Sequence, residues 1–261
     1  MSDVKLTSHS KNWNNSPATV RKGFLSIDKG PSRIRPVVRQ SASLALDRFH
    51  QRQQFVSPLG NRNGKYLAAK RLFDIVGALI AIVVLGPIML ATIVGLTVTT
   101  KGRPLFCQER VGYCGRRFRM IKFRTMRLDA DRLQHAVVNE KDGPIFKNRC
   151  DPRITKIGRI LRSTSIDELP QLFNVLLGSM SLVGPRPPVA KEVAQYKPWQ
   201  RKRLAVKPGL TCLWQVSGRS EIQFEHWVRM DLWYLQNQSL ATDLKLLVRT
   251  PASVLSGRGA Y

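Results

Sequence analysis

Two adjacent carboxylates, Asp167 and Glu168, are the side chains of this 261-residue protein best suited to chemistry. Arg162 lies five residues before Asp167, and Arg186 follows within the segment Gly184-Pro-Arg-Pro187. A carboxylate can act as a nucleophile or hold a divalent cation, and arginine binds phosphate through paired N–H donors. The set indicates chemistry on a phosphorylated substrate, although two acids that only cap a helix would give the same pattern.

A helix is expected directly after the carboxylates. Pro170 is tolerated in a first turn, and Gly178 is typical of a helix end. The helix begins either at Ser165, which forms a capping-box pattern with Glu168, or at Asp167 as the cap. Either start places both acids at the positive end of the helix dipole, which favours carboxylates and phosphate. The apolar face has i, i+3, i+4, i+7 spacing and comprises Leu169, Leu172, Phe173 and Leu176.

A second feature is the uncharged run from Ile75 to Val98, which at 24 residues is long enough to cross a bilayer as a helix. It is too long, and too far from the N-terminus, for a cleaved signal peptide. A buried core helix is the alternative, but a globular core seldom needs so many apolar positions. We therefore expect a membrane helix.

The membrane helix is expected to break and return. Gly86 and Pro87 lie in its middle, where proline removes a backbone hydrogen bond and kinks the helix. Basic residues prefer the cytoplasmic side of a membrane, and they flank both ends of the run. A re-entrant hairpin keeps both flanks on the cytoplasmic side, which a straight crossing does not. The flanking residues are Lys65, Lys70 and Arg71 before the run, and Lys101, Arg103, Arg110, Arg116 and Arg117 after it.

Composition indicates an anionic partner, because the formal net charge is +26 and the isoelectric point is near 10.9. Nucleic acid, anionic lipid and phosphate-bearing substrates all fit the charge alone. The membrane run, and the lack of a zinc-finger or RNP-like pattern, argue against nucleic acid and favour the anionic lipids of a cytoplasmic membrane leaflet. The four cysteines have neither zinc spacing nor a disulfide pattern, and we interpret them as reduced thiols on the cytoplasmic side: Cys107, Cys114, Cys150 and Cys212.

The chain divides into a basic, mostly disordered arm over residues 1–64, with a short helix at 44–55, and one domain over residues 65–261. The domain is expected to be mainly α, with a small β-hairpin and amphipathic helices at the membrane interface. Strands are predicted at 104–108 and 118–123, around a turn at 112–115. Helices are predicted at 124–138, 157–161 and 224–235, at 240–250 closed by Pro251, and as two short helices within 189–206.

Aromatic residues leave two interpretations open. Segment 189–206 mixes Tyr196 and Trp199 with lysine and arginine, which suits the headgroup region of a bilayer. The later aromatic residues are more typical of a core than of a membrane contact: Phe224, Trp227, Trp233 and Tyr234.

Several motifs, taken in order, resemble the bacterial sugar transferase family, the monotopic polyprenyl-phosphate phosphoglycosyl transferases. The resemblance covers residues 65–261. Within the family, the sequence is most similar to the branch of undecaprenyl-phosphate galactose phosphotransferases that begin exopolysaccharide synthesis. One apolar run argues against the larger relatives that have four extra membrane helices. The motifs are Lys70-Arg-Leu-Phe-Asp74, Gln108-Glu-Arg-Val-Gly112, Lys122-Phe-Arg-Thr-Met126, the segment 151–158, Asp167-Glu168, Gly184-Pro-Arg-Pro187 and the segment 207–219.

The resemblance implies transfer of a hexose 1-phosphate from a UDP-sugar to undecaprenyl phosphate, with release of UMP, at the cytoplasmic face of the inner membrane. It implies that Asp167 is the nucleophile and forms a covalent phosphosugar intermediate, and that Asp167 and Glu168 hold Mg²⁺. Arg162 and Arg186 match phosphate-binding positions. Galactose and glucose are the favoured sugars, with an N-acetylated hexose less so, and the sequence leaves open whether the chain forms a homo-oligomer.

Other family positions carry weaker implications. Four residues are expected either to contact nucleotide or phosphate or to make structural hydrogen bonds: Arg124, Lys207, Gln215 and Arg219. Lys70 and Arg71 match a basic pair at the headgroups, and Gly86 with Pro87 matches the helix break. Cys212 stands where relatives usually have glycine, which would strain the backbone if that turn needs positive φ. A basic membrane scaffold without activity is the competing function, although it would not need the intact acidic and Gly-Pro-Arg-Pro motifs together.

Overall fold

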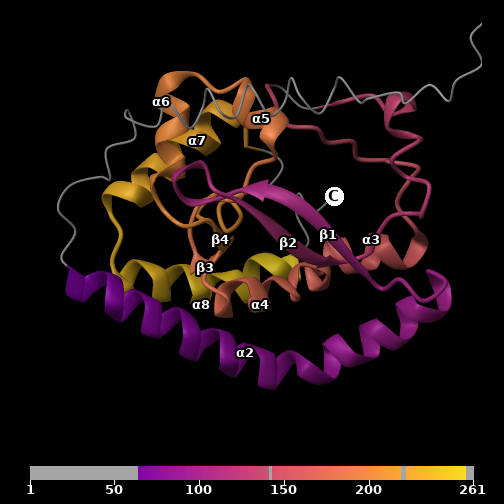
Figure 1. Cartoon of the computed structure of the whole chain (residues 1–261), viewed down its shortest axis with the longest axis horizontal. Coiled ribbons are helices and arrows are strands. Elements are labelled where there is room, and N and C mark those ends of the chain that lie inside the picture. The colour runs from indigo at the N-terminus through magenta and orange to yellow at the C-terminus, as the bar shows by residue number, and fades with distance from the viewer. Residues whose placement is uncertain (1–63, 141–142, 219–221, 257–261) are drawn as a thin grey trace, which may run out of the picture.

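The computed structural model describes residues 64–140, 143–218 and 222–256. A long helix, α2 (Gly64–Thr99), runs along one side of the rest of the described chain (Figure 1). The expected N-terminal arm and its short helix lie outside the described residues, apart from Gly64.

Helix α2 has the length and composition needed to cross a membrane, and only 11 % of its most apolar window is buried. The helix continues through Gly86 and Pro87, and Figure 1 shows it curving near its middle. The expected sharp break is therefore a bend in this structure. Proline removes one hydrogen bond and displaces one carbonyl, but the turns on either side keep their own bonds. The re-entrant path in a membrane stays a prediction.

The predicted hairpin is confirmed, with longer strands. Strand β1 (Leu105–Val111) pairs antiparallel with β2 (Arg117–Phe123), with Leu105 opposite Phe123 and Val111 opposite Arg117. The turn between them contains Cys114 at φ +51° and Gly115 at φ +79°. The hairpin brings alternate side chains of both strands to one surface, which matters for the site below.

A second, parallel pair of strands was not predicted from the sequence. Strand β3 (Ser181–Val183) lies beside β4 (Gly209–Thr211). A Cβ atom on Gly209 would lie 2.0 Å from the backbone N of Gly184, so glycine is needed where the two segments cross. This close approach fixes the start of the Gly-Pro-Arg-Pro segment directly after β3.

The helices mostly agree with prediction. Those expected near 157–161, within 189–206 and at 224–235 are confirmed, and the last helix continues past Pro251. The prediction of a helix at 124–138 is wrong, because this segment forms turns with one short 3₁₀ helix, Gln134–Ala136, and its Met126 pairs with Ile154 in an isolated β-bridge. The remaining helices are α3 (Lys156–Ser163), α4 (Gln171–Leu176), α5 (Ala190–Ala194), α6 (Pro198–Arg201), α7 (Phe224–Gln236) and α8 (Leu240–Ser256).

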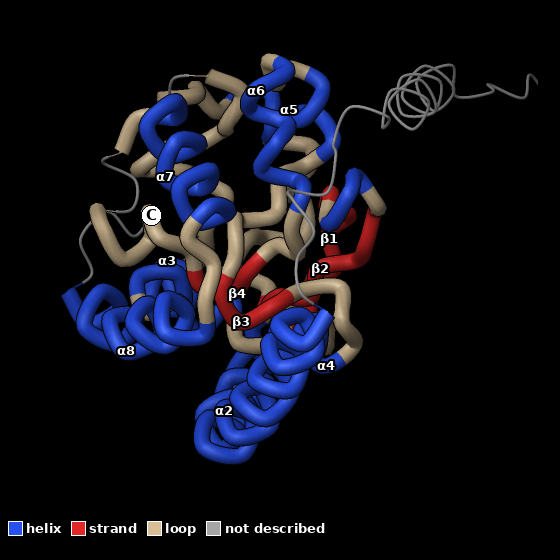
Figure 2. Tube along the Cα trace, turned by 90° about the vertical axis from the view of Figure 1, so that its left-hand side faces the viewer, coloured by secondary structure: helices blue, strands red, loops and turns tan. Residues whose placement is uncertain are grey.

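The elements form layers above α2. Helices α3, α4 and α8 lie nearest to it, whereas α5, α6 and α7 lie on the far side of the strands (Figures 1 and 2). Exposed apolar side chains on the near helices include Ile160, Phe173 and Val248. The expectation that segment 189–206 lies at the membrane interface is therefore corrected, since α5 and α6 are remote from α2 and Tyr196 is buried in the core.

The later aromatic residues mostly form core, as expected. Phe224 and Trp227 pack with Trp214 and Tyr196 in one apolar cluster, and Tyr234 is buried in a second cluster. Trp233 is the exception, with an exposed fraction of 49 %. The second cluster also contains Ala78 of α2, so the long helix contributes to the core of the domain.

Buried polar contacts also tie α2 to the domain. Lys70 Nζ lies 2.8 Å from both Asp74 Oδ1 and Asp243 Oδ2. Asp74 Oδ1 accepts hydrogen bonds from Ser181 Oγ and Leu182 N, and the Tyr234 hydroxyl lies 2.7 Å from Asp243 Oδ1. We call Lys70, Asp74, Tyr234 and Asp243 the docking network. It fixes α2 against β3 and therefore against the segment that carries Arg186.

The neighbouring Arg71 completes this attachment. Its guanidinium donates to the carbonyl oxygens of Val175 and Leu176, at 2.6 and 2.7 Å, where α4 ends. Both members of the basic pair thus have partners inside the protein, and their contact with lipid headgroups stays a prediction.

Candidate active site

Asp167 and Glu168 lie in a short 3₁₀ turn, Ile166–Glu168, between α3 and α4. Ser165 adopts the left-handed conformation with φ +55°, and its side chain does not make the capping hydrogen bond. The capping-box prediction is therefore wrong. The left-handed residue turns the chain sharply after α3, so the two acids precede α4 instead of lying in its first turn.

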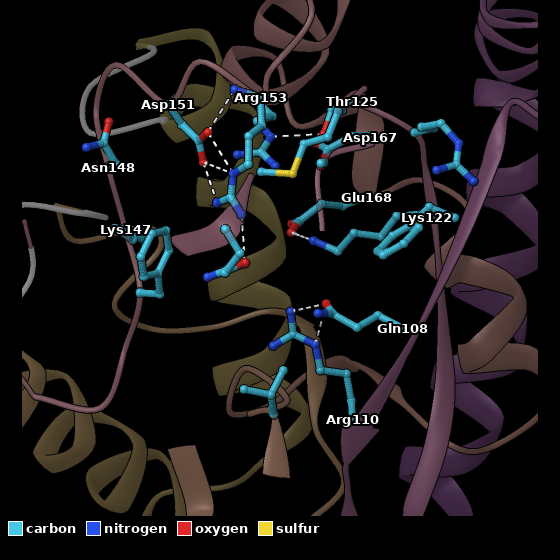
Figure 3. A pocket seen from close by; sticks show the side chains of 18 of the residues that line it. Gln108, Arg110, Lys122, Thr125, Lys147, Asn148, Asp151, Arg153, Asp167 and Glu168 are labelled. Atoms are coloured by element: carbon cyan, nitrogen blue, oxygen red, sulfur yellow. Dashed lines mark hydrogen bonds and ion pairs between the residues drawn. The ribbon is translucent and has the colours of Figure 1, made fainter. Parts of the chain in front are cut away.

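The turn borders a cavity of about 880 Å³. Asp167 and Glu168 are on one side of it, with Lys122 beside them, and Lys147 and Asn148 face them from the opposite side (Figure 3). The cavity is large enough for a ligand of several hundred daltons.

Lys122, on β2, also belongs to the site. It lies in one of the family motifs, but no role was expected for it from the sequence. Its Nζ donates a hydrogen bond to Glu168 Oε1 at 2.8 Å (Figure 3). Burial lowers the pKa of Lys122, although the neighbouring Glu168 and Asp167 act in the opposite direction. A lysine between Ile121 and Phe123 in an apolar strand was the available sequence signal.

The two carboxyl groups differ in acidity. Burial and the adjacent Glu168 raise the pKa of Asp167 to about 6, against the opposing effect of Lys122 and Arg162. Burial would also raise the pKa of Glu168, but Lys122 and Arg186 outweigh it and hold that pKa at about 2. Glu168 is thus a fixed negative charge, whereas Asp167 is the more basic of the pair and the better electron-pair donor.

Arg162 is positioned by a tight contact between α3 and the segment after β2. Its Nε donates to Thr125 Oγ1 at 3.0 Å, and Thr155 N donates to Thr125 O at 3.0 Å. A Cβ on Gly158 would lie 2.0 Å from that same carbonyl oxygen, so only glycine lets α3 pack this closely. The contact places Arg162 in the cavity wall beside Asp167.

Arg186 also lines the cavity, and its backbone is held from two sides. Arg203 donates to the carbonyl oxygen of Arg186 at 3.0 Å, and Arg110 donates to the carbonyl oxygen of Pro187 at 3.0 Å. The guanidinium of Arg186 has no hydrogen bond or ion pair with another residue in the described part of the chain. Its donors are therefore available to a ligand.

Arg110 and Gln108, both on β1, were also missed. Gln108 Oε1 accepts from Arg110 Nε at 3.1 Å and from its Nη2 at 2.6 Å (Figure 3). Burial, together with nearby Arg186, lowers the pKa of Arg110 to about 10, so it remains cationic at neutral pH. The motif Gln108-Glu-Arg-Val-Gly112, in which the two residues are two positions apart and so share one face of the strand, was the available sequence signal.

The residues with weaker support from the sequence differ in whether they line the cavity and in the bonds they make. Gln215 lines the cavity, and its Nε2 lies 3.5 Å from Glu168 Oε2. Arg124 lines the cavity but donates to the carbonyl oxygens of Arg103 and Leu105, which supports a structural role. Lys207 is exposed and outside the cavity lining, and Arg219 lies outside the described residues.

Cys212 does not strain the chain, because it is not among the described residues with positive φ. Its backbone N and its Sγ each lie 2.9 Å from Gln215 Oε1, so both atoms hold the amide of Gln215. None of the four cysteines forms a disulfide.

The donor set limits what metal could bind here. Within the described ranges, no group of three or more His, Cys, Asp or Glu side chains could hold an ion. Magnesium nevertheless binds through one or two carboxylates together with substrate phosphate oxygens. Asp167 and Glu168 therefore fit a magnesium ion that is shared with a phosphorylated ligand, and do not fit a metal site built from protein ligands alone.

Comparison with known proteins identifies the family. The model of the bacterial sugar transferase family matches residues 65–257. The chain belongs to this family. The match begins within α2 and ends just beyond α8, so it spans both the long apolar helix and the carboxylate site.

Individual relatives carry more specific names. The chain is 46 % identical over 199 residues to the galactosyl transferase CpsE of Streptococcus agalactiae, and 42 % identical over 213 residues to the undecaprenyl-phosphate galactose phosphotransferase of Salmonella typhimurium. These alignments cover 75 and 78 % of the chain, but only 44 and 43 % of the relatives. The exopolysaccharide production protein ExoY of Sinorhizobium fredii is 38 % identical over 74 % of the chain and 88 % of its own length. The chain thus spans less than half of the first two relatives.

Proposed function

We propose that the protein transfers a hexose 1-phosphate, with galactose or glucose as the sugar, from a UDP-sugar to undecaprenyl phosphate and releases UMP. The observation that carries the proposal is the pair Asp167, which is buried, and Glu168, which is partly buried, beside a large cavity whose wall also contains Lys122, Arg162 and Arg186. Such an arrangement suits a doubly charged diphosphate, and relatives are named as transferases of this kind. The reaction would begin synthesis of an exopolysaccharide.

In the first step, a carboxylate oxygen of Asp167 attacks the phosphorus that bears the sugar. The bond from that phosphorus to the bridging oxygen breaks, and UMP leaves with the electron pair. The product is an aspartyl phosphosugar. The raised pKa of Asp167 favours this role over Glu168, whose charge is engaged by Lys122 at 2.8 Å.

In the second step, a phosphate oxygen of undecaprenyl phosphate attacks the same phosphorus. The acyl phosphate bond breaks, the carboxylate of Asp167 is released, and the lipid diphosphate sugar is formed. Arg162 and Arg186 hold the phosphate oxygens in both steps and oppose their growing negative charge.

Asp167 and Glu168 would hold Mg²⁺ together with the donor diphosphate. When bound, the ion would neutralise phosphate charge and make the phosphorus more open to attack. Lys122 keeps Glu168 ionised and oriented, so that one carboxylate oxygen remains for the metal.

The membrane arrangement belongs to the same proposal. Helix α2 would enter the inner membrane from the cytoplasmic face and return at its bend, and the exposed apolar residues of α3, α4 and α8 would rest on the lipid surface. Anionic headgroups would attract the strongly basic chain. A polyprenyl phosphate in that leaflet is then close to the cavity.

The function is tested with detergent-extracted protein, Mg²⁺, undecaprenyl phosphate and a panel of UDP-sugars. Release of UMP with one sugar, dependent on the lipid, supports the proposal and names the donor. Release of UDP contradicts the mechanism, and no release from folded protein favours an inactive scaffold.

The topology is tested by labelling cysteines introduced singly at Lys65 and Lys101, in a variant without the native cysteines. Both positions should resist an impermeant thiol reagent in intact cells if α2 returns to the cytoplasmic side. Labelling of only one position would show that α2 crosses the membrane. Pro87→Ala, which restores a helical hydrogen bond, should then expose one flank.

A further inference from the structure

Gln171, the first residue of α4, has a buried amide without a partner. The residue is 3 % exposed, and its Nε2 has no hydrogen-bond acceptor in the described structure. Buried donors are nearly always satisfied, and an unpaired one usually indicates water, an ion or a ligand. The side chain lies three residues after Glu168, at the edge of the active site.

The amide borders a second, small cavity of about 10 Å³, room for about one water-sized oxygen atom. This cavity shares four lining residues with the large one: Lys122, Glu168, Arg186 and Gln215. The two spaces are therefore separated only by side chains of the active site.

The groups around the small cavity have the composition of an anion site. Gln171 contributes a free amide donor, Arg186 a free guanidinium and Lys122 an ammonium group. Glu168 is the one carboxylate in the lining, and Lys122 already pairs with it at 2.8 Å. Donors thus outnumber acceptors, and an incoming oxygen with lone pairs would satisfy them.

We propose that Gln171 donates a hydrogen bond to a phosphate oxygen that enters this small cavity while the rest of the phosphate lies beside Arg186. The inference rests on the proposed function, and it adds a substrate-binding residue to those that the sequence suggested. A single oxygen matches the volume, and the unpaired amide is then explained by a ligand that binds during the reaction.

Two phosphates could supply this oxygen. One is the diphosphate of the sugar donor, and the other is the phosphate of the lipid acceptor. Met120 and Leu210, which line the small cavity, also pack in the core cluster that contains Ala78 of α2. The subsite therefore lies on the side of the carboxylates that faces the membrane helix, which favours the lipid phosphate.

The test uses Gln171→Met, which keeps the length of the side chain and removes the donor. Because an unpaired buried amide is replaced by an apolar group, the melting temperature should stay the same or rise. Turnover should nevertheless fall about tenfold or more, the loss expected for one hydrogen bond to a charged oxygen. A residue with a purely structural role would not separate stability and activity in this way.

Gln200→Met is the matched control. Gln200 is also buried, but its Oε1 accepts from Lys197 N at 2.7 Å, so the substitution breaks a satisfied bond. This variant should melt at a lower temperature and keep its turnover at temperatures where it is folded.

The two phosphate sources are distinguished by half-reactions. A slower burst of UMP from UDP-sugar alone in Gln171→Met assigns the donor phosphate. An unchanged burst with a raised KM for undecaprenyl phosphate assigns the lipid phosphate. If both measurements match wild type, or if activity falls only together with melting temperature, the subsite is refuted.

A separate binding measurement covers failure of the proposed function. Inorganic phosphate should raise the melting temperature of the wild-type protein and have a smaller effect on Gln171→Met. If wild type releases no UMP, the proposed function fails and this titration alone decides the subsite. Equal shifts in the two proteins would then refute it.

Discussion

Two of the buried clusters of charged and polar groups in the described part of the protein are built differently. In the docking network, Lys70 lies 2.8 Å from each of two aspartates, and Tyr234 contacts the second of them. Around Asp167 and Glu168, Lys122 makes one ion pair, whereas the guanidinium of Arg186 and the amide of Gln171 make no hydrogen bond or ion pair within the described chain.

The difference distinguishes a structural cluster from a ligand-binding one. A closed set of partners stabilises one arrangement, and breaking it leaves a buried charge uncompensated. An incomplete set holds donors ready for a substrate, at some cost in stability. We therefore expect substitutions in the docking network to lower stability, and those in the active site to lower turnover.

The largest expected effect is that of Asp167→Asn. Loss of the proposed nucleophile should lower kcat by on the order of 10⁴-fold or more. The melting temperature should not fall, because burial already disfavours the charged form of this carboxyl, whose pKa is raised to about 6. Steady-state release of UMP measures kcat, and a melting curve in the same detergent measures the melting temperature. Wild-type turnover in this variant would exclude Asp167 as the nucleophile.

The opposite outcome is expected for Lys70→Met. Removing the shared cation leaves Asp74 and Asp243 buried without compensation, so the free energy of unfolding should fall by about 3–5 kcal/mol. Lys245→Met, an exposed position on α8, is the control and should change it little. Denaturation in detergent measures the loss. An unchanged unfolding free energy would mean that the docking network contributes no stability.

Arg186→Ala tests the cluster around Asp167 and Glu168. Since the guanidinium makes no hydrogen bond or ion pair in the described protein, stability should change little. Loss of its bonds to phosphate should reduce kcat/KM for the UDP-sugar by about 10–100-fold. Initial rates over a range of donor concentrations give the ratio. A fall in melting temperature comparable to that of Lys70→Met would place Arg186 among the structural residues instead.

The smallest effect is expected for Cys212→Gly. The thiol is the weaker of two donors to Gln215, and the backbone N remains in the variant. Turnover should therefore stay within about threefold of wild type. A tenfold loss in initial rate would show that the thiol itself holds Gln215 against Glu168.

Local patterns predicted much of this molecule. The long apolar run, the hairpin and most helices follow from periodicity and from glycine and proline positions, which act over a few residues. Segment 124–138, where a helix was predicted, has apolar residues at helical spacing in Met126, Leu133 and Val137. In the structure, however, Met126 pairs with Ile154 in a β-bridge. A tertiary contact therefore overrode local propensity.

The candidate site was predicted in part for the same reason. Asp167, Glu168, Arg162 and Arg186 belong to motifs, and all four border the cavity. Lys122 and Arg110 reach the site from the hairpin, and Lys70 meets Asp243 across 173 positions of the chain. The sequence contains no short-range signal for such pairings, because they exist only once the chain is folded.

The burial of Ala78 and Leu96 on α2 has a practical consequence for protein production. Both side chains are almost fully enclosed by the rest of the protein, although α2 is the segment an engineer would delete to obtain a water-soluble version. A fragment starting near residue 100 would lack these contacts, together with Lys70 and Arg71, and would expose the surfaces they cover. Expression of the catalytic part therefore requires keeping the helix and supplying detergent or lipid, or redesigning its outward face with polar residues.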